Sequence, residues 1–446
     1  MQQMPTSPPR RSSRGILLGG SSPSWTWSGH QRSALILGPT RSGKTSSVIV
    51  PNVIAAPGAV VTTSTKADIL EATLRARLGS GSVLMFDPFG STPAPPDVVR
   101  IGWSPLHASR SWDGALLMAS SMVTAAHQRS AQGRHGADHW SERSASLLAP
   151  ILFAAACANR TMAEVVQWVD RHHGSDALIE LESSVGSNHP APALLSGILA
   201  TDSREQSGIW STTSGVLGAY RSLGALRSTE GPALDPRRFV EGNHTLHICA
   251  PGRQQALIAP LVVGLLSEIQ TAAYERGDVH RPVLFALDEL ANIAPLPDLP
   301  QLVSEGGGQG LLTIGCLQDL SQARTRWGAE ADGLLSLFST TLLLGGIADR
   351  ATIRSFSDLA GPTEIARHSH SISGQQRGRP VASLTTSSSR EQRLDVDEVS
   401  RGRPGHGLLL YARNHVGWVK LTVAHRDEPW RMLTRVHDRA TRSRDR

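Results

Sequence analysis

The chain has 446 residues, of which 39% are hydrophobic and 18% are charged. This length and composition predict two or three globular domains and exclude collagen, coiled coil and wholesale disorder. Three isolated cysteines predict neither a disulfide framework nor a zinc knuckle, and a reducing cytosol is the expected compartment. The longest apolar stretches are interrupted and stay shorter than the roughly 18 residues of a membrane span, so we expect no integral membrane protein.

The net charge is +6, and the basic excess lies at the two ends of the chain. Residues 1–14 contain three arginines and no acidic residue, residues 426–446 contain seven arginines against four acidic residues, and residues 15–425 balance at 34 of each sign. We therefore predict a basic arm over residues 1–30 and a basic tail over residues 426–446. Such ends are either solvated termini or segments that bind phosphate groups.

The first part of the body alternates short apolar runs with helical patterns. We predict strands at 33–37, 59–63 and 82–86, a helix through Val48 to Ile54, and a second helix over 68–78. Strands that alternate with helices are typical of a parallel α/β sheet.

The pattern then changes to helical periodicity with almost no β-branched runs, which predicts an all-α unit. We place this unit at 111–235, inserted between two parts of one α/β domain at 31–110 and 236–425. An insertion of this kind usually serves substrate or partner recognition. In the second part we predict strands at 244–250, 282–287, 311–316 and 341–344, and a helix over 257–275.

The end of the body has two distinct segments. Residues 369–393 are rich in Ser, Arg and Gly without periodicity, so we predict a mobile loop there. Two apolar runs at 407–412 and 417–423 then predict a two-stranded ending.

Residues 38–45 fit the pattern G-x-x-x-x-G-K-[ST] and stand between a predicted strand and a predicted helix, the context that this phosphate-binding loop requires. The glycines let successive backbone N–H groups face the phosphates, Lys44 neutralises the β- and γ-phosphate charge, and the Thr45 hydroxyl can ligate Mg²⁺. The motif predicts ATP and Mg²⁺ as cofactors. The predicted nucleotide-binding residues are Gly38, Pro39, Thr40, Arg41, Ser42, Gly43, Lys44, Thr45 and Ser46.

The predicted strand at 282–287 runs directly into Asp288 and Glu289, which is the Walker B pattern of ATPases. We predict that Asp288 holds Mg²⁺ through water and that Glu289 orients and deprotonates the attacking water. The alternative is a buried strand that ends in a surface acidic pair. Adjacent acidic residues beside a phosphate-binding loop favour ATP hydrolysis.

Two polar residues follow other predicted strands. Gln318 stands after the strand at 311–316, where its side chain could sense the γ-phosphate or position water, and we predict a catalytic role; the alternative is that it caps the next helix. Lys66 stands after the strand at 59–63, either as a contact to nucleic acid or an acidic partner or as a solvated lysine.

From about residue 30 to 425 the chain resembles the TraG/TraD-type coupling ATPases of conjugative type IV secretion. The resemblance lies in GPTRSGKTS, STKAD, MFDPFG with IGWSPL, ICAPGRQQALIAPLVVGLLSEI, TIGCLQDL and, most specifically, LDELANIAPLPDLP. It implies a RecA-like P-loop NTPase sheet with an inserted all-α domain. It also implies a homo-hexameric ring that receives DNA or nucleoprotein, with a relaxase or other secretion substrate, and pumps it into a type IV secretion channel.

Two features depart from this family. The family begins with a transmembrane segment, which we do not expect here, so we expect a cytoplasmic chain held at the inner face of the membrane through a partner. The family also carries a basic residue near segment 305–310, which here reads Glu-Gly-Gly-Gly-Gln-Gly. An arginine that completes a neighbouring subunit's site must then come from elsewhere. The candidates are Arg350 and Arg354, with Arg324 and Arg326 as further choices; each could equally be a helix-surface arginine.

Two other functions fit parts of this pattern. One is an FtsK/HerA-like DNA translocase outside conjugation, against which the stretch from Asn292 to Pro300 argues. The other is a non-translocating adaptor that binds ATP and recruits a relaxase or effector. DNA-stimulated ATP turnover separates a motor from an adaptor.

Overall fold

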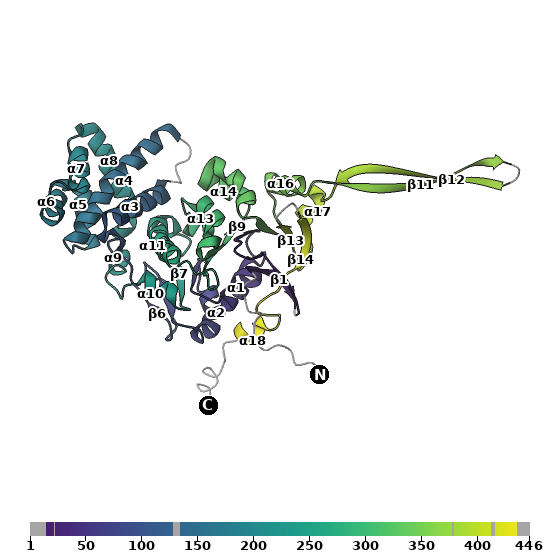
Figure 1. Ribbon diagram of the computed structural model, residues 1–446, viewed down its shortest axis with the longest axis horizontal. Coiled ribbons are helices and arrows are strands. Elements are labelled where there is room, and N and C mark those ends of the chain that lie inside the picture. The colour runs from purple at the N-terminus through teal and green to yellow at the C-terminus, as the bar shows by residue number, and fades with distance from the viewer. Residues whose placement is uncertain (1–14, 22, 128–133, 377–378, 412–414, 435–446) are drawn as a thin grey trace, which may run out of the picture.

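The computed structural model describes residues 15–21, 23–127, 134–376, 379–411 and 415–434. In these residues the central sheet has ten strands in the order β14-β13-β10-β3-β9-β8-β4-β7-β5-β6 (Figure 1). The strands are β3 (Ala34–Leu37), β4 (Val60–Ser64), β5 (Val83–Phe86), β6 (Val99–Arg100), β7 (Thr245–Cys249), β8 (Val283–Leu287), β9 (Leu311–Leu317), β10 (Thr340–Leu344), β13 (His406–Tyr411) and β14 (His415–Lys420).

From β10 to β6 all neighbouring strands are parallel, and β13 and β14 add an antiparallel edge. The predicted strands of the α/β domain and the two-stranded ending are present within three residues of their expected bounds. The predicted fold class, a P-loop NTPase sheet with an all-helical insertion, is confirmed. Because the strands are parallel, the loops that follow β3, β8, β9 and β10 all leave the same edge of the sheet.

Helices cover both faces of the sheet. The helix after β3 begins as a π-helical turn, η1 (Thr45–Ile49), and continues as α1 (Val50–Ala55); its Val48, Ile49 and Val53 pack with one face of the sheet. The other face shares a large core with α11 and the insertion. The remaining helices of this domain are α2 (Asp68–Leu78), α10 (Pro236–Glu241), α11 (Gln255–Arg276), α12 (Leu290–Ile293), α13 (Leu299–Glu305), α14 (Leu320–Trp327), α15 (Leu334–Leu337), α16 (Arg350–Ala360) and α17 (Val396–Arg401).

Helix α11 confirms the helix predicted over 257–275 and extends it by two residues at its start and one at its end. Pro260 and Gly264 interrupt its apolar run but do not end the helix. Among the described residues, α11 is the one helix long and apolar enough to cross a membrane by length and composition. Since 72% of its most apolar window is buried inside the protein, it is a core helix in this structure.

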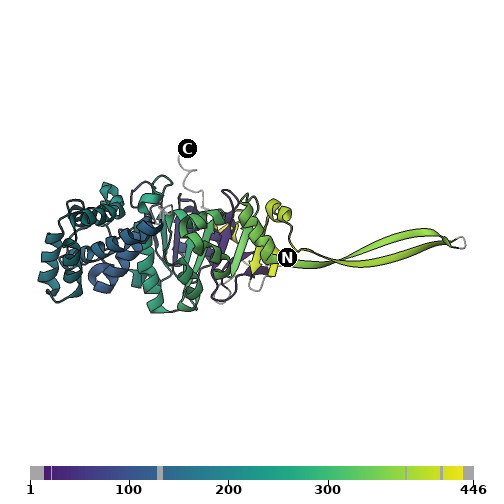
Figure 2. The ribbon, with the colours of Figure 1, turned by 90° about the horizontal axis from the view of Figure 1, so that it is seen from above.

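The insertion consists of helices, and its described residues between 111 and 235 form no strand. Figure 1 shows it at one end of the molecule, beside α11, and the turned view in Figure 2 shows the same elongated arrangement. Its helices are α3 (Trp112–His127), α4 (Arg134–Cys157), α5 (Met162–Asp170), α6 (Gly174–Val185), α7 (Pro190–Leu199), α8 (Ser203–Val216), η3 (Leu217–Arg221) and α9 (Leu223–Arg227).

The mobile loop predicted at 369–393 is wrong. The segment belongs to a long antiparallel ribbon of β11 (Pro362–Gln376) and β12 (Arg379–Gln392), which projects from the end of the molecule opposite the insertion (Figures 1 and 2). The sequence did not predict these two strands because they pair only with each other among the described residues. The ribbon is a separate two-stranded sheet that projects from the body, so its sequence lacks the apolar and polar alternation of a strand packed on a core.

The two ends of the body are also more ordered than the predicted arm and tail. Within the arm, β1 (Leu17–Ser21) pairs with β2 (Ser24–Trp27). Within the tail, α18 (Trp430–Thr434) buries Trp430, whose ring meets that of Trp25 edge-on at a centroid distance of 5.9 Å. The terminal segments 1–14 and 435–446 lie outside the described residues.

Candidate nucleotide-binding site

Three loops that are far apart in sequence meet at the carboxyl edge of the sheet. Strand β9 lies between β3 and β8, so the loop that holds Gln318 lies between the glycine loop and the acidic pair. Leu37 pairs with Leu317, and the Gly38 N–H donates to the Leu317 carbonyl at 3.1 Å. The parallel register therefore brings together the three motifs that the sequence analysis singled out.

The glycine loop has the backbone that its pattern predicts. Arg41 and Gly43 have positive φ angles of 64° and 95°. A Cβ at Gly38 would lie 2.6 Å from the Ser42 hydroxyl oxygen and 3.0 Å from the Leu344 Cβ, so a larger residue would require these side chains to move. At the tip of the loop, Thr40 and Arg41 are exposed.

Lys44 lies inside this loop and is 8% exposed. Its ammonium group donates to the carbonyls of Gly38 and Pro39, the latter at 2.9 Å. A buried ammonium whose hydrogen bonds go to neutral carbonyls attracts a negatively charged group strongly, because such a group also compensates its charge.

Thr45 and Asp288 form the direct link between the glycine loop and the Walker B strand. The Thr45 hydroxyl donates to an Asp288 carboxylate oxygen at 2.8 Å, and the Thr63 hydroxyl donates to the Asp288 carbonyl at 2.6 Å. Burial raises the pKa of Asp288, and the neighbouring Glu289 carboxylate adds to this effect. Hydroxyl and carboxylate oxygens are the ligands that Mg²⁺ prefers, and a cation here would offset the buried negative charge, so the residues fit Mg²⁺.

Glu289 has a left-handed backbone, with φ of 56° and ψ of 42°. A non-glycine residue adopts this conformation only where the surrounding structure holds it. Here the Asn292 side-chain amide donates to a Glu289 carboxylate oxygen at 3.1 Å, which orients the carboxylate. The carboxylate predicted to act as the general base is therefore fixed in both backbone and side chain.

Gln318 does not cap the helix that follows it. Asp319 does so: its carboxylate accepts from the Ser321 and Gln322 N–H groups at 2.9 and 3.2 Å. The Gln318 N–H itself donates to the Gln322 side-chain oxygen at 2.9 Å. Asp319 therefore caps the helix in place of Gln318, and a catalytic role of Gln318 stays a prediction.

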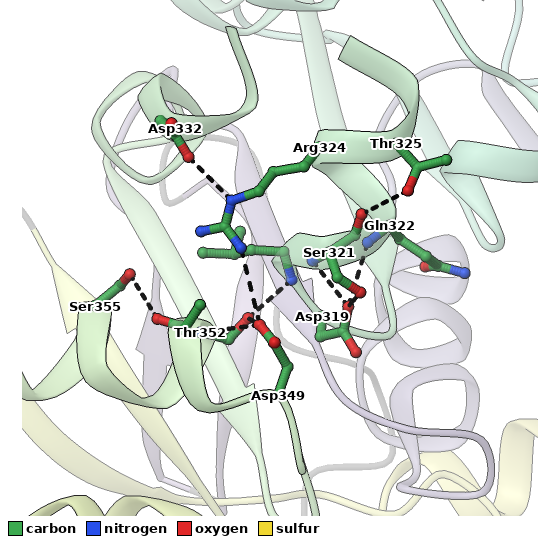
Figure 3. Close-up of polar contacts among 11 residues, drawn as sticks. Asp319, Ser321, Gln322, Arg324, Thr325, Asp332, Asp349, Thr352 and Ser355 are labelled. Atoms are coloured by element: carbon green, nitrogen blue, oxygen red, sulfur yellow. Dashed lines mark hydrogen bonds and ion pairs between the residues drawn. The ribbon is translucent and has the colours of Figure 1, made fainter. Parts of the chain in front are cut away.

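A polar network joins the loop after β9 to the helix after β10 (Figure 3). The Leu320 N–H donates to the Thr352 hydroxyl at 3.0 Å, and that hydroxyl donates to Asp349 at 2.6 Å. The Thr352 side chain is the main cause of a lowered pKa of the Asp349 carboxyl group. Arg324 lies 3.9 Å from Asp349 and 3.1 Å from Asp332. The beginnings of α14 and α16 are therefore held as one unit.

The four candidate arginines separate into two kinds. Arg324 is engaged in this network, and Arg326 donates to the Ala291 carbonyl. Arg350 and Arg354 lie one turn apart near the start of α16, are exposed, and form no ion pair within the described part of the chain. Since α16 follows β10 at the carboxyl edge of the sheet, these two arginines are exposed at the same edge as the glycine loop.

Two glycines of the segment at 305–310 are required by packing. A Cβ at Gly307 would lie 1.9 Å from the Gln31 carbonyl oxygen, and one at Gly310 would lie 2.9 Å from the Asp278 backbone. The segment precedes β9, so it lies at the amino edge of the sheet, opposite the glycine loop. Lys66 is exposed beyond the end of β4, which leaves both of its predicted roles open.

Sequence reasoning missed the residues that anchor the helix after the glycine loop. Asn52 is fully buried; its side chain accepts from the Leu17 N–H and donates to the Leu17 carbonyl, both at 2.8 Å. The Ala424 N–H donates to the Ser46 carbonyl at 2.9 Å. An asparagine inside an otherwise apolar helix pattern was the available signal for the first contact.

Known proteins share a family domain and a fold with this chain. Residues 282–401 match the family model described as the TraM recognition site of TraD and TraG. No curated protein sequence matches the chain. Among solved structures, the unbound monoclinic form of the bacterial conjugative coupling protein TrwBdeltaN70 matches with a TM-score of 0.68 and 19% identity, over 88% of this chain and 85% of that chain.

Two further solved structures match. The plasmid coupling protein TrwB in complex with ADP and Mg²⁺ has a TM-score of 0.65 and 19% identity, over 88% of this chain and 86% of that chain. VirB4 of Thermoanaerobacter pseudethanolicus has a TM-score of 0.51 and 13% identity, over 95% of this chain and 100% of that chain. The family model and the fold together support the resemblance to TraG/TraD-type coupling proteins.

The network of Figure 3 makes a local prediction. Thr352→Val removes the acceptor of the buried Leu320 N–H, which should cost about 1–3 kcal/mol. Hydrogen exchange of the Leu320 amide should accelerate about tenfold or more, because local opening becomes easier. Ser355→Ala is the matched control, since among the described residues the Ser355 hydroxyl donates to the Ala351 carbonyl of its own helix. Equal protection of Leu320 in wild type and Thr352→Val would show that the network does not hold the loop.

Proposed function

We propose that this chain is an ATP-hydrolysing coupling protein that delivers DNA or nucleoprotein to a type IV secretion channel. The observation that carries the proposal is the hydrogen bond between Thr45 and Asp288, which joins a phosphate-binding loop to a Walker B carboxylate. The fold shared with TrwB and the matched family domain support the coupling role.

In this proposal the site binds ATP with Mg²⁺, whose charge would help to neutralise the phosphates. TrwB has been solved with ADP and Mg²⁺ and with ATP and GTP analogues, which supports the same ligands here. Lys44 would exchange its loop carbonyls for phosphate oxygens, and Thr45 and Asp288 would hold the metal. The oriented Glu289 carboxylate would take the proton of the attacking water, and Gln318 would position that water.

The wider assembly follows from the family resemblance. We propose that six chains form a ring and that the ring acts on DNA bound to a relaxase or to another secreted protein. Residues 282–401, whose family model is named for TraM recognition in TraD and TraG, would contribute to recognising such a partner. We propose a cytoplasmic location at the inner face of the membrane, where channel components would hold the ring.

Substitutions should separate binding from chemistry at this site. Lys44→Ala should abolish ATP binding, because it removes the charge that meets the ground-state phosphates. Glu289→Gln should keep binding and lower the turnover rate at least about a hundredfold, because it removes the base. Gln318→Ala should keep affinity and reduce turnover to an intermediate rate. Titration with a fluorescent ATP analogue and steady-state phosphate release measure the two steps.

Hydrolysis by Glu289→Gln protein at the wild-type rate would refute the role of this carboxylate. If wild-type protein binds ATP and neither DNA nor a ring changes its turnover, the non-translocating adaptor becomes the better description.

We further propose that Arg350, with Arg354 beside it, completes the ATP site of the neighbouring subunit. Both are exposed on the same edge of the sheet as the glycine loop, whereas Arg324 and Arg326 are bound within their own chain. An arginine supplied in trans would neutralise charge that develops on the γ-phosphate during hydrolysis.

Mixing inactive chains tests the arginine. Lys44→Ala protein mixed with Arg350→Ala protein should regain activity, because some interfaces pair an intact glycine loop with an intact arginine. A mixture of Lys44→Ala with Glu289→Gln is the control and should stay inactive, since both changes damage the same side of an interface. Activity per chain should also rise with protein concentration. Absence of recovery in a mixture that assembles would assign the arginine to another position.

A further inference from the structure

A backbone hydrogen bond joins the phosphate-binding loop to a segment near the end of the chain. The helix after the loop begins as the π-helical turn η1, in which the Val50 N–H donates to the Thr45 carbonyl, five residues back. In this pattern the Ser46 carbonyl would accept from residue 51, which is a proline and has no N–H. The Ala424 N–H donates to the Ser46 carbonyl instead, at 2.9 Å. The segment around Ala424 therefore contacts one of the predicted nucleotide-binding residues directly.

Residues 423–427 form a compact turn at this contact. The Asp427 carboxylate accepts from the Val423 N–H at 2.7 Å, and the Asp427 N–H donates to the Val423 carbonyl at 2.8 Å. Beyond the turn, Trp430 is fully buried in an apolar cluster with residues of α1. The turn is therefore closed by its own hydrogen bonds and anchored to the helix that follows the phosphate-binding loop.

The order of the sheet places this turn on the nucleoside side of the site. Asp288 and Glu289 follow β8, which lies beyond β9 on one side of β3, whereas residues 421–427 follow β14, which lies on the other side of β3. In the proposed function the terminal phosphate points toward Asp288 and Glu289, because they hold the metal and the attacking water. The nucleoside is at the other end of the phosphate chain, so it extends away from β8 and toward the turn.

The order of residues within the loop leads to the same side. In a loop of this pattern, Lys44 meets the β- and γ-phosphates and Thr45 meets Mg²⁺, while backbone N–H groups face the α- and β-phosphates. Ser46 follows these two residues at the start of the helix, so its backbone lies toward the α-phosphate, which carries the nucleoside. The hydrogen bond from Ala424 to Ser46 thus fixes the turn next to that part of the ligand.

The turn carries two exposed side chains that suit a purine base. His425 and Arg426 directly follow Ala424, and both are exposed. Within the described part of the chain, neither side chain forms an ion pair or a hydrogen bond. An imidazole ring and a guanidinium group each have a flat face on which a base can stack. Stacking alone does not read the exocyclic groups of the base, so such a contact accepts adenine and guanine alike.

We propose that the turn of residues 423–427 forms the nucleoside side of the nucleotide site, with His425 and Arg426 stacking on the purine base. This inference rests on the proposed function, in which the glycine loop binds ATP, and it adds the residues that bind the nucleoside. The loop holds the phosphates, the turn holds the base, and the hydrogen bond to Ser46 keeps the two at a fixed separation.

The first test compares ATP with a ligand that lacks the nucleoside. Affinities of the full chain for ATP, GTP and inorganic tripolyphosphate, each with Mg²⁺, are measured by isothermal titration calorimetry. Wild type should bind ATP more tightly than tripolyphosphate. The double variant His425→Ala, Arg426→Ala should bind ATP and GTP about tenfold or more weakly than wild type, because stacking on the base is lost, and tripolyphosphate within about twofold of wild type.

A matched control is available at the opposite edge of the sheet. His280 and Arg281 are the same two residue types in the same order, are exposed, and precede β8. Arg281 donates to the Glu241 carbonyl at 2.8 Å, so the control also removes a contact with the body. The double variant His280→Ala, Arg281→Ala should bind all three ligands as wild type does.

Four results of these titrations would overturn the proposal. They are unchanged ATP affinity in the turn variant, equal losses of ATP affinity in the turn and control variants, equal losses for ATP and tripolyphosphate in the turn variant, and wild type that binds ATP no more tightly than tripolyphosphate. Wild type that binds neither ligand would refute the proposed function itself, whereas the other results leave ATP binding intact and remove only the nucleoside assignment.

Photolabelling gives a second measurement that needs no variant. 8-Azido-ATP carries its photoreactive group on the base, so irradiation of wild type with this probe and Mg²⁺ should label residues 423–427, as located by mass spectrometry of the peptides. An excess of ATP should prevent the labelling. Label that ATP prevents but that lies only in other segments of the chain would place the base elsewhere and overturn the proposal.

Discussion

The hydrogen bond from the Thr45 hydroxyl to the Asp288 carboxylate is the contact on which the rest of the site depends. It joins residues 243 positions apart, and it exists because β3, β9 and β8 are parallel neighbours whose ends reach the same edge. Burial of the Asp288 carboxylate is unfavourable and raises its pKa, and the hydrogen bond from Thr45 partly offsets this effect. A buried carboxylate destabilises the folded protein but provides a ligand for a cation. Such a loss of stability is expected at a functional site.

The elements around this contact are arranged by the same sheet. On one side of β3, strand β10 leads into α16, the exposed arginines and the ribbon; on the other side, the sheet continues toward the helical insertion (Figure 1). Thr352 joins α16 to the loop after β9 through one hydroxyl that accepts from Leu320 and donates to Asp349. The eleven-residue helix α16, which carries the exposed arginines, is thus connected through one buried side chain to the loop that holds the proposed water-positioning residue, Gln318.

The sequence predicted those parts whose residues face a core or bind their own backbone. Strands buried on both faces read as apolar runs, and the glycine loop reads from its spacing, so the sheet and Gly38 to Thr45 were predictable. The ribbon was not, because its stability does not come from a covered face. The hairpin of β1 and β2 was not predicted. Its main anchor, Asn52, lies in a helix whose apolar pattern already predicted burial, so that pattern did not reveal the contact with Leu17. Arg350 and Arg354 could be distinguished from Arg324 and Arg326 only by their contacts.

The most direct test of this account is the thermal stability of Asp288→Asn protein with and without ATP and Mg²⁺. Because burial raises the pKa of Asp288, its ionised form costs stability at neutral pH, so the nucleotide-free variant should unfold at a higher temperature than wild type. That difference should shrink as the pH falls toward the ordinary carboxyl pKa of about 4. The variant should also lose most of the stabilisation that ATP with Mg²⁺ gives wild type. A variant that unfolds below wild type without nucleotide, yet keeps the full stabilisation by ATP and Mg²⁺, would contradict the account.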